Sequence, residues 1–194
     1  MIKMKYHKEV MEIIFHARGG QGAKTASEII AETAVEEGKF AQAFPYFGPE
    51  RSGAPTKTFI RISNQEIRTH EAIDDPDAVV VLDETLLSGK LDLVRNLDKN
   101  EFLIINTKKS SEEIKAKLGG FQGKIYAIDA SGISQKIIGQ PRPNTAILGK
   151  LIQVTEVVKL ASLCQKFREK FEPKIGKEFS DKNILAIEKA YDSI

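Results

Sequence analysis

The stretch His16-Ala-Arg-Gly-Gly-Gln-Gly-Ala-Lys-Thr25 decides the fold that this sequence predicts. A short apolar run at residues 12–15 comes before it, and a segment with helical spacing of small and apolar residues follows it and ends at Gly38. A strand, a glycine-rich loop and a helix in this order present backbone N–H groups and a helix N-terminus to an anion. Three of the four residues 19–22 are glycines, which lack Cβ atoms and let a ligand approach the main chain.

Two nucleotide-binding motifs almost fit this loop, and neither is complete. A P-loop requires Gly, four residues and then Gly-Lys-Ser/Thr, but Arg18 and Ala23 stand at its two glycine positions. A dinucleotide-binding fingerprint requires a third glycine and an acid at the end of the next strand. Thr25 replaces that glycine, and the next predicted strand, residues 40–44, ends without an acid. The loop therefore predicts either a site for a phosphate-type group or a tight turn that binds no ligand.

Composition places the chain among single globular domains. It has 194 residues, of which 41% are hydrophobic and 29% are charged, and its net charge is +2. A charge this small gives no reason to expect nucleic acid or an anionic membrane as a partner. No apolar run reaches the ~18 residues of a membrane span, and no signal-peptide-like apolar region follows the lysine-bearing residues 1–8. We expect a cytoplasmic protein with an N-terminal arm, residues 1–11, and one α/β domain, residues 12–194.

The single cysteine argues against several kinds of site. Cys164 cannot form an internal disulfide, and a cysteine-ligated iron–sulfur cluster needs about four thiolates. The three histidines, His7, His16 and His70, are too scattered to indicate zinc. Cys164 also lies in a helix-spaced apolar pattern, so we interpret it as a core residue. The sequence predicts no metal site.

The rest of the chain alternates between strand and helix patterns. Residues 56–62 alternate in polarity, and a polar turn separates them from residues 67–70, which predicts a β-hairpin and hence a mixed sheet. Apolar runs typical of strands buried on both faces occupy residues 77–82 and 102–105, and residues 124–128 are predicted to form a further strand. Helical spacing predicts helices at residues 86–97, 147–155, 160–171 and 180–191, with residues 172–179 joining the last two.

Capping residues mark the expected starts of three helices. Ser110 or Ser111 precedes a pair of glutamates, Ser131 follows the strand at residues 124–128, and Asn144 follows a proline. Each of these side chains can accept a hydrogen bond from a free N–H of a first helical turn. For Asn144 this role could coexist with contact to a ligand at the same helix N-terminus.

Polar side chains recur where the predicted strands end. Gln21, Asp83, Asn106 and Asp129 each follow one of them. In open α/β sheets, ligands bind in the crevice outside the carboxyl ends of the strands. We interpret Asp129 as a helix cap, whereas Asn106 is the stronger site candidate because Asn is locally unfavourable in a strand.

Five segments of the sequence together match one known family. They are, in order, residues 16–22, 42–55, 76–83, 106–107 and 143–149. With them the chain resembles the gamma subunits of the 2-oxoacid:ferredoxin oxidoreductases, most closely those of the pyruvate type. The segments span nearly the whole chain beyond the N-terminal arm, so their combination is far more specific than any single one.

This resemblance implies a fold and a role. The fold is a three-layer α/β/α domain with a mostly parallel, mixed sheet that includes one antiparallel hairpin. The role is that of a subunit in a complex with alpha, beta and delta subunits, which converts a 2-oxoacid to an acyl-CoA and passes electrons to ferredoxin. Thiamine diphosphate and the iron–sulfur clusters are expected on the partner subunits. This chain is expected to bind coenzyme A as a substrate, to hold no catalytic residue and to be inactive alone.

The resemblance also implies which residues contact coenzyme A. The fused enzymes of the family carry two lysines where this chain has Glu50-Arg51. A carboxylate repels phosphate, so Arg51 is the expected phosphate contact of the two. The resemblance places contacts at Gly20, Gln21, Arg51 and Asn144, and with the adjoining and strand-end residues the full set of expected contacts is Gly19, Gly20, Gln21, Gly22, Arg51, Ser52, Asn106 and Asn144.

Three other functions remain open at this point. The chain could be the gamma subunit of a branched-chain 2-oxoacid:ferredoxin oxidoreductase, because the oxoacid pocket lies mainly on other subunits in this family. It could be an assembly subunit that contacts no ligand. A stand-alone dinucleotide-dependent dehydrogenase is disfavoured by the incomplete fingerprint around Thr25.

Overall fold

The computed structural model describes residues 9–46, 53–88 and 93–193. Its centre is a six-stranded sheet with the order β2-β3-β1-β4-β5-β6. The strands β1, β4, β5 and β6 run parallel to one another, whereas β3 is antiparallel to both β1 and β2. The strands are β1 (Val10–Arg18), β2 (Phe40–Tyr46), β3 (Pro55–Ser63), β4 (Ala78–Val81), β5 (Phe102–Asn106) and β6 (Lys124–Ile128).

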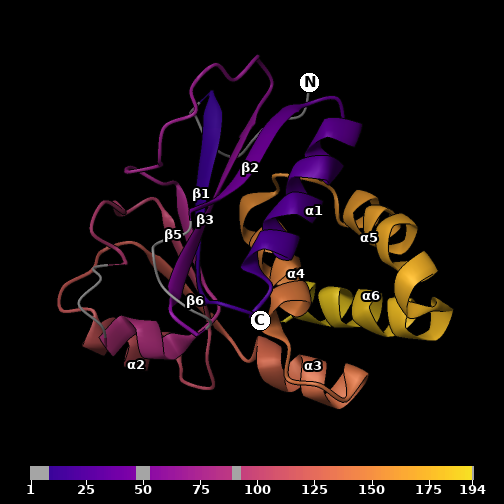
Figure 1. The fold of residues 1–194 in the computed structure, drawn as a ribbon. Helices are drawn as coiled ribbons and strands as arrows, with labels where there is room; N and C mark the ends of the chain where they lie inside the picture. Colours follow the sequence, from indigo (N-terminus) through magenta and orange to yellow (C-terminus); the bar gives the residue numbers. More distant parts are fainter. Residues whose placement is uncertain (1–8, 47–52, 89–92, 194) are drawn as a thin grey trace.

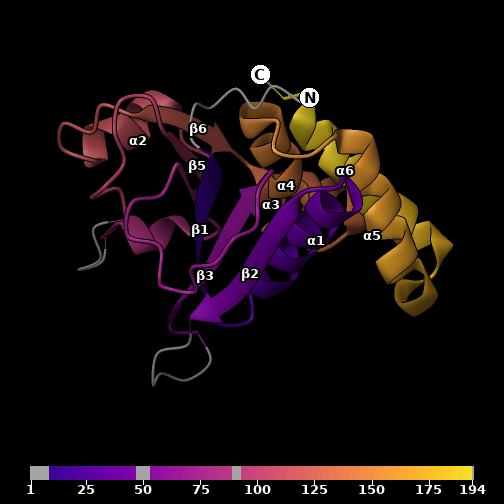
Figure 2. The same ribbon diagram turned by 90° about the horizontal axis from the view of Figure 1, so that it is seen from above.

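Helices cover both faces of this sheet, so the expected three-layer fold with a mixed sheet is confirmed. Figures 1 and 2 show the N-terminal helix and the C-terminal helices on one face and α2 on the other. None of the helices among the described residues has the length and hydrophobicity needed to cross a membrane. The helices are α1 (Ala23–Glu36), the 3₁₀ helix η1 (Glu84–Ser88), α2 (Ser111–Lys117), α3 (Ala130–Ile138), α4 (Pro143–Thr155), α5 (Leu160–Ile175) and α6 (Lys177–Tyr191).

The side chains of the central strands divide between two hydrophobic clusters, one on each face. In β1, Ile13 and Phe15 pack with α1, α4, α5 and α6, while Ile14 faces the opposite cluster with Leu86 and Ile114. This alternation is the period of two that a strand imposes on its side chains. The four residues of β4 are all buried, as a strand covered on both faces requires.

The predicted hairpin partner of β3 was wrong. Residues 67–70 form no strand, and β3 pairs instead with β1 on one side and β2 on the other. Both edges of β3 are thereby occupied. Residues 67–70 offer one apolar side chain, Ile67, and the other three are exposed, so they have no face to bury against the sheet.

Two helix predictions also need correction. Where a helix was expected at residues 86–97, the structure has the short η1, and residues 93–96 form turns; Leu91 lies outside the described residues. Near the C-terminus, the expected connection at residues 172–179 is a single residue, Gly176, with a φ of 80°. The polar composition of residues 172–179 hid this continuity, because the segment is helical but largely exposed.

A close helix contact generates a prediction about stability. Gly149 in α4 packs so tightly against α6 that a Cβ atom there would lie 1.9 Å from the carbonyl oxygen of Ile187. Gly149→Ala should therefore lower the free energy of unfolding by about 2 kcal/mol, because overpacking a backbone contact outweighs the better helix propensity of alanine. Urea unfolding measures the change, and Leu185→Ala, at an exposed position of α6, is the control and should shift it by less than about 0.5 kcal/mol. Equal, small effects of the two substitutions would show that α4 and α6 are not packed this closely.

Candidate functional site

A cleft of about 960 Å³ opens at the carboxyl ends of β1, β4 and β5. Its floor is made by the glycine-rich loop after β1, the turn after β4 and the end of β5, and α4, α5 and α6 supply its walls. This is the position at which open α/β sheets bind ligands. Its lining includes Gly20, Gln21, Gly22, Thr25, Asp83, Asn106, Ser131, Arg142 and Asn144, together with apolar residues of α5 and α6.

The glycine-rich loop needs glycine at two positions. Gly20 and Gly22 have φ angles of 94° and 81°, a region that other residues rarely adopt. Gly22 is the N-cap of α1, and no side chain caps this helix. The first N–H groups of α1 therefore have no intrahelical acceptor and carry the positive end of the helix dipole.

A second open helix N-terminus meets the first in the cleft. Arg142 is the N-cap of α4, which has no side-chain cap and no acidic residue in its first turn. A Cβ atom at Gly22 would lie 2.6 Å from Nδ2 of Asn144, so the two helix starts are in contact. The cleft thus joins two positive helix ends, an arrangement that favours an anion.

Two of the predicted caps differ in the structure. Asn144 is the second residue of α4 and not its N-cap, because Pro143, which lacks an N–H and has a fixed φ, occupies the first helical position. At α3 the N-cap is Asp129, as interpreted, and its carboxylate accepts a hydrogen bond from Gly132 N. Ser131 lies inside that helix and hydrogen-bonds to Asn106 instead. The predicted cap at Ser110 is confirmed, and it forms a capping box with Glu113.

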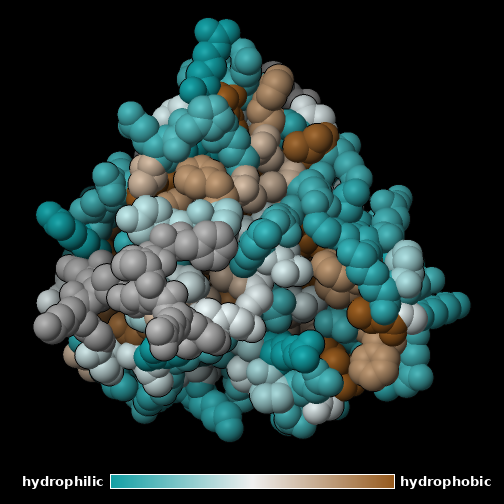
Figure 3. Space-filling model, in the orientation of Figure 1, coloured by the Kyte–Doolittle hydropathy of each residue, from teal (hydrophilic) through white to brown (hydrophobic). Residues whose placement is uncertain are grey.

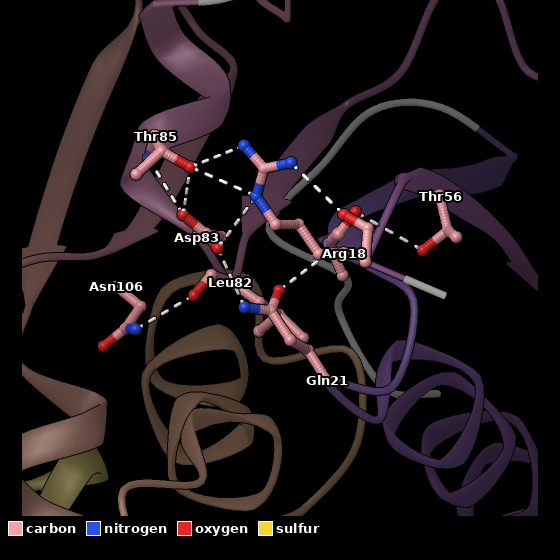
Figure 4. A network of polar contacts seen from close by, with 9 residues as sticks. Arg18, Gln21, Thr56, Leu82, Asp83, Thr85 and Asn106 are labelled. Carbon is pink, nitrogen blue, oxygen red and sulfur yellow. Dashed lines mark hydrogen bonds and ion pairs between the residues drawn. The ribbon is translucent and has the colours of Figure 1, made fainter. Parts of the chain in front are cut away.

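The glycine-rich loop is tied to the turn after β4 by a network of polar contacts (Figure 4). Gln21 donates from Nε2 to Asp83 at 2.9 Å, and Arg18 forms an ion pair with the same carboxylate at 3.2 Å. The guanidinium of Arg18 also donates to Thr85 Oγ1 and to the carbonyl oxygen of Gly53. Three segments that are far apart in the sequence are thereby joined at one edge of the cleft.

Asn106 lines the cleft with its amide fully engaged. Its Nδ2 donates to the carbonyl oxygen of Leu82 and to Ser131 Oγ, each at 2.9 Å, and its Oδ1 accepts from Ser131 N at 3.0 Å. These contacts join the ends of β4 and β5 to the start of α3. They explain the unusual Asn at the end of a strand without a ligand, and a ligand that accepts a hydrogen bond from this side chain would have to replace one of the two bonds that Nδ2 donates.

The two carboxylates of the cleft are both compensated by the protein. Burial raises the pKa of Asp83, but hydrogen bonds from Thr85 and Gln21 and the charge of Arg18 outweigh it, so the pKa is lowered overall. The hydrogen bond from Lys109 is the main cause that lowers the pKa of Glu84. Arg142, by contrast, has no ion pair within the described part of the chain. The cleft therefore offers a free cation and no free anion among its described residues.

One wall of the cleft is apolar. Phe167, Phe171 and Ile175 follow one another at intervals of four residues along α5. Phe179 lies in the first turn of α6, beyond Gly176, the residue that separates the two helices. Ile175 and Phe179 are 38% and 44% exposed. Figure 3 shows brown and tan side chains gathered near the junction of α5 and α6, at the lower right of the molecule.

The cysteine and the buried histidine have structural roles. Cys164 is buried in α5, as expected, and burial raises the pKa of its thiol to about 11. Burial in β1, and next the charge of Lys57, lowers the pKa of His16 to about 3, so this histidine is neutral at physiological pH. Residues 9–46, 53–88 and 93–193 contain no group of His, Cys, Asp and Glu side chains that could hold a metal ion.

The structure brings together most of the residues that the sequence singled out. Gly20, Gln21, Gly22, Asn106 and Asn144 all line the cleft. Gly19 does not line the cleft; its N–H faces the start of β3 and donates to the carbonyl oxygen of Ala54 at 2.9 Å. Arg51 and Ser52 lie outside the described residues.

Several residues in the cleft or beside it were not predicted. Arg18 was noticed only as a departure from the P-loop, although a charged residue that ends a buried strand was a usable signal. Arg142 lies between two prolines just before α4, which places it at the cleft. The apolar pattern around Cys164 in α5 indicated a core helix, and the sequence could not show that the last turn of this helix leaves the core.

Known proteins resemble this chain over almost all of its length. The family model described as pyruvate ferredoxin/flavodoxin oxidoreductase matches residues 12–193. The chain is 42% identical over 191 residues to pyruvate synthase subunit PorC of Thermotoga maritima, and the matched residues cover 98% of each chain. It is 45% identical over 183 residues to the pyruvate/ketoisovalerate oxidoreductases common subunit gamma of Thermococcus kodakarensis, covering 94% of this chain and 96% of the relative. The crystal structure of pyruvate oxidoreductase subunit PORC from Thermotoga maritima matches with a TM-score of 0.84 and 41% identity, over 96% of this chain and 97% of that one.

The two glycines with positive φ provide a matched test of the cleft's geometry. Gly20→Ala and Gly22→Ala both place a side chain at a left-handed position, which costs about 1–2 kcal/mol. A Cβ at Gly20 meets nothing within 4 Å, whereas one at Gly22 meets Asn144. Gly22→Ala should therefore destabilise the chain more in urea unfolding, by about 1–3 kcal/mol beyond Gly20→Ala.

The double variant Gly22→Ala/Asn144→Ala is the control for this prediction. It removes the amide that the new Cβ would strike, so it should lose less stability than the sum of the two single substitutions. Equal losses for the two glycine variants, with additive behaviour of the double variant, would mean that the two helix starts do not touch.

Proposed function

The chain belongs to the pyruvate ferredoxin/flavodoxin oxidoreductase family, and from this premise we propose that it is the gamma subunit of a multi-subunit pyruvate:ferredoxin oxidoreductase. The complex converts pyruvate and coenzyme A to acetyl-CoA and carbon dioxide, and ferredoxin receives the two electrons released. This subunit binds coenzyme A and closes the active site. The observation that carries the proposal is a cleft in which two uncapped helix N-termini face an apolar wall.

Coenzyme A has the chemistry that such a cleft recognises. Its phosphates suit the N–H groups at the starts of α1 and α4, with Arg142 as a nearby cation. Its adenine ring and pantetheine arm can pack on the side chains of Phe171 and Phe179. Arg51 and Ser52 complete the expected contacts on sequence grounds. Since the thiol must meet an acyl intermediate on a partner chain, the contribution of this subunit is positioning.

The redox and decarboxylating groups belong to the partner subunits in this proposal. The chain has one cysteine, Cys164, which is buried in α5 and cannot supply the about four thiolates of an iron–sulfur cluster. Thiamine diphosphate and the clusters are therefore assigned to the alpha, beta and delta subunits. The isolated chain is accordingly inactive.

A second function is favoured by one specific observation. The relative from Thermococcus kodakarensis is named as a gamma subunit common to pyruvate and ketoisovalerate oxidoreductases. One gamma subunit can serve two complexes if it handles only coenzyme A, which both reactions consume. This chain can therefore be shared with a branched-chain 2-oxoacid oxidoreductase, or belong to that enzyme alone.

Purification of the complex through a tag on this chain tests the proposal. We expect alpha, beta and delta subunits to co-purify, and the complex to reduce a viologen dye with pyruvate and coenzyme A. The tagged chain alone should reduce no dye. Parallel assays with pyruvate and with 2-oxoisovalerate separate the two candidates. A complex whose dye reduction does not depend on coenzyme A, or a chain that carries the activity alone, would contradict the proposal.

Arg142 provides a prediction within the cleft. Arg142→Ala should raise the KM for coenzyme A in the complex about tenfold, the effect of losing one charge-assisted contact, while kcat stays near its original value. Arg142→Lys should retain part of the affinity. Arg168→Ala is the control, because Arg168 pairs with Asp181 and Glu172 away from the cleft and should leave KM unchanged. If Arg142→Ala also leaves KM unchanged, this residue is not a contact of coenzyme A.

A further inference from the structure

The carboxylate of Asp83 receives donors from two segments of the chain, the end of β1 with its glycine-rich loop and the turn after β4 (Figure 4). Its Oδ2 accepts from Gln21 Nε2 at 2.9 Å and lies 3.2 Å from Arg18 Nε. Its Oδ1 accepts from Thr85 Oγ1 at 2.6 Å and from Thr85 N at 3.0 Å. Only 18% of its side chain is exposed, so water contributes little to these contacts. Asp83 therefore holds the glycine-rich loop and the turn after β4 in one fixed relation.

Gln21 uses both ends of its amide inside the loop. Its Oε1 accepts from Arg18 N at 2.7 Å, while its Nε2 is bound to Asp83. Its main-chain N–H donates to the carbonyl oxygen of Arg18 at 3.0 Å, which closes the turn. The Gln21 side chain thus forms a brace across the loop, and its bonds within the protein argue against a role as a ligand contact.

The loop's own main chain is left with its donors free. Within the described part of the chain, the N–H groups of Gly20 and Gly22 have no acceptor, and neither do the first N–H groups of α1. Gly20 and Gly22 adopt their positive φ angles without strain, but glycines leave a main chain free to take many other shapes, so contacts with the surroundings determine which shape the loop holds. The brace formed by Gln21 and Asp83 supplies those contacts.

Arg18 extends the same network to a third segment. Its Nη1 donates to the carbonyl oxygen of Gly53 at 3.2 Å, and the neighbouring Gly19 N donates to Ala54. Gly53 directly follows Arg51 and Ser52 in the sequence. The ion pair of Arg18 with Asp83 therefore also fixes where the chain enters β3.

We propose that Asp83 is a positioning residue for coenzyme A binding, which acts through Gln21 and Arg18 to hold the glycine-rich loop in the shape that receives the phosphates. The inference rests on the proposed function of the cleft. It also reassigns Gln21, whose side chain shapes the loop while the loop's N–H groups meet the ligand. A carboxylate cannot itself attract a phosphate, so any benefit of Asp83 to binding has to be indirect.

The direction in which Asp83→Asn changes the KM for coenzyme A separates a positioning role from that of a negative charge that merely lies beside the ligand. An asparagine amide would face the donors of Gln21 and Arg18 with a donor of its own, or lose the bonds to Thr85, so the brace would loosen. We expect the KM for coenzyme A to rise about tenfold, with kcat at saturating coenzyme A little changed. If Asp83 is only a negative charge beside the ligand, its neutralisation should lower KM instead, and that result would overturn the proposal.

Two further variants keep the test decisive if Asp83→Asn fails to assemble. Thr85→Val removes the hydroxyl that bonds both Asp83 and Arg18, and Thr85→Ser restores it. We expect a raised KM for the valine variant and recovery with serine. Asp129→Asn is the matched control: it makes the same change at the end of β6, it keeps a good helix cap, and it has no bond to the loop. Its KM should equal that of the unaltered complex.

The assay distinguishes failure of this inference from failure of the proposed function. If the unaltered complex shows no dependence on coenzyme A, the proposed function is wrong. If the dependence is present but Asp83→Asn and Thr85→Val both leave KM unchanged, only the role of Asp83 is wrong. The formation of the intermediate from pyruvate before coenzyme A enters should be intact in all variants, and its loss in Asp83→Asn would show that the loop serves the oxoacid half of the reaction.

Discussion

The parallel pairing of β1 with β4 is the constraint on which the candidate site depends. The register places His16 beside Val81, and the bond from Leu82 N to the carbonyl oxygen of His16 continues the ladder by one residue. Because both strands run in the same direction, their carboxyl ends reach the same edge of the sheet together. Arg18 and Asp83 each lie two residues beyond that pair, which is why they can form an ion pair although 65 positions separate them.

Burial fixes this register, and polar contacts refine it. The residues of β4 are buried on both faces, and each buried valine contributes about 1.5–3 kcal/mol. An ion pair as exposed as that of Arg18, whose side chain is 37% exposed, contributes about 1 kcal/mol or less. The sheet therefore determines that the loop and the turn meet, while the contacts of Asp83 and Gln21 determine the shape in which they meet.

The sequence predicted the layers and the strand ends well, and the pairing of β3 poorly. Residues 78–81 of β4 and 102–105 of β5 are apolar and bounded by polar residues, so their pattern alone identifies these two strands. A partner for β3 could not be found in this way, because eight residues lie between β2 and β3 and alternation in polarity does not specify which neighbour a strand takes. In the cleft, polarity next to strand ends located Gln21, Asp83 and Asn106 correctly but could not show which of their atoms are already bonded.

Occupied hydrogen bonds change how the polar residues of the cleft are understood. A polar side chain in a glycine-rich loop invites assignment to the ligand, yet the amides of Gln21 and Asn106 are both engaged with the protein. The carboxylates are balanced in the same way, Asp83 by Arg18 and Glu84 by Lys109. With these groups satisfied, the attraction that an anion meets in the cleft comes from the free N–H groups of the loop, the ends of α1 and α4, and Arg142. Main-chain donors of this kind recognise phosphate without requiring any one side chain, so glycine, which keeps the main chain accessible, is the residue type that the loop can least replace.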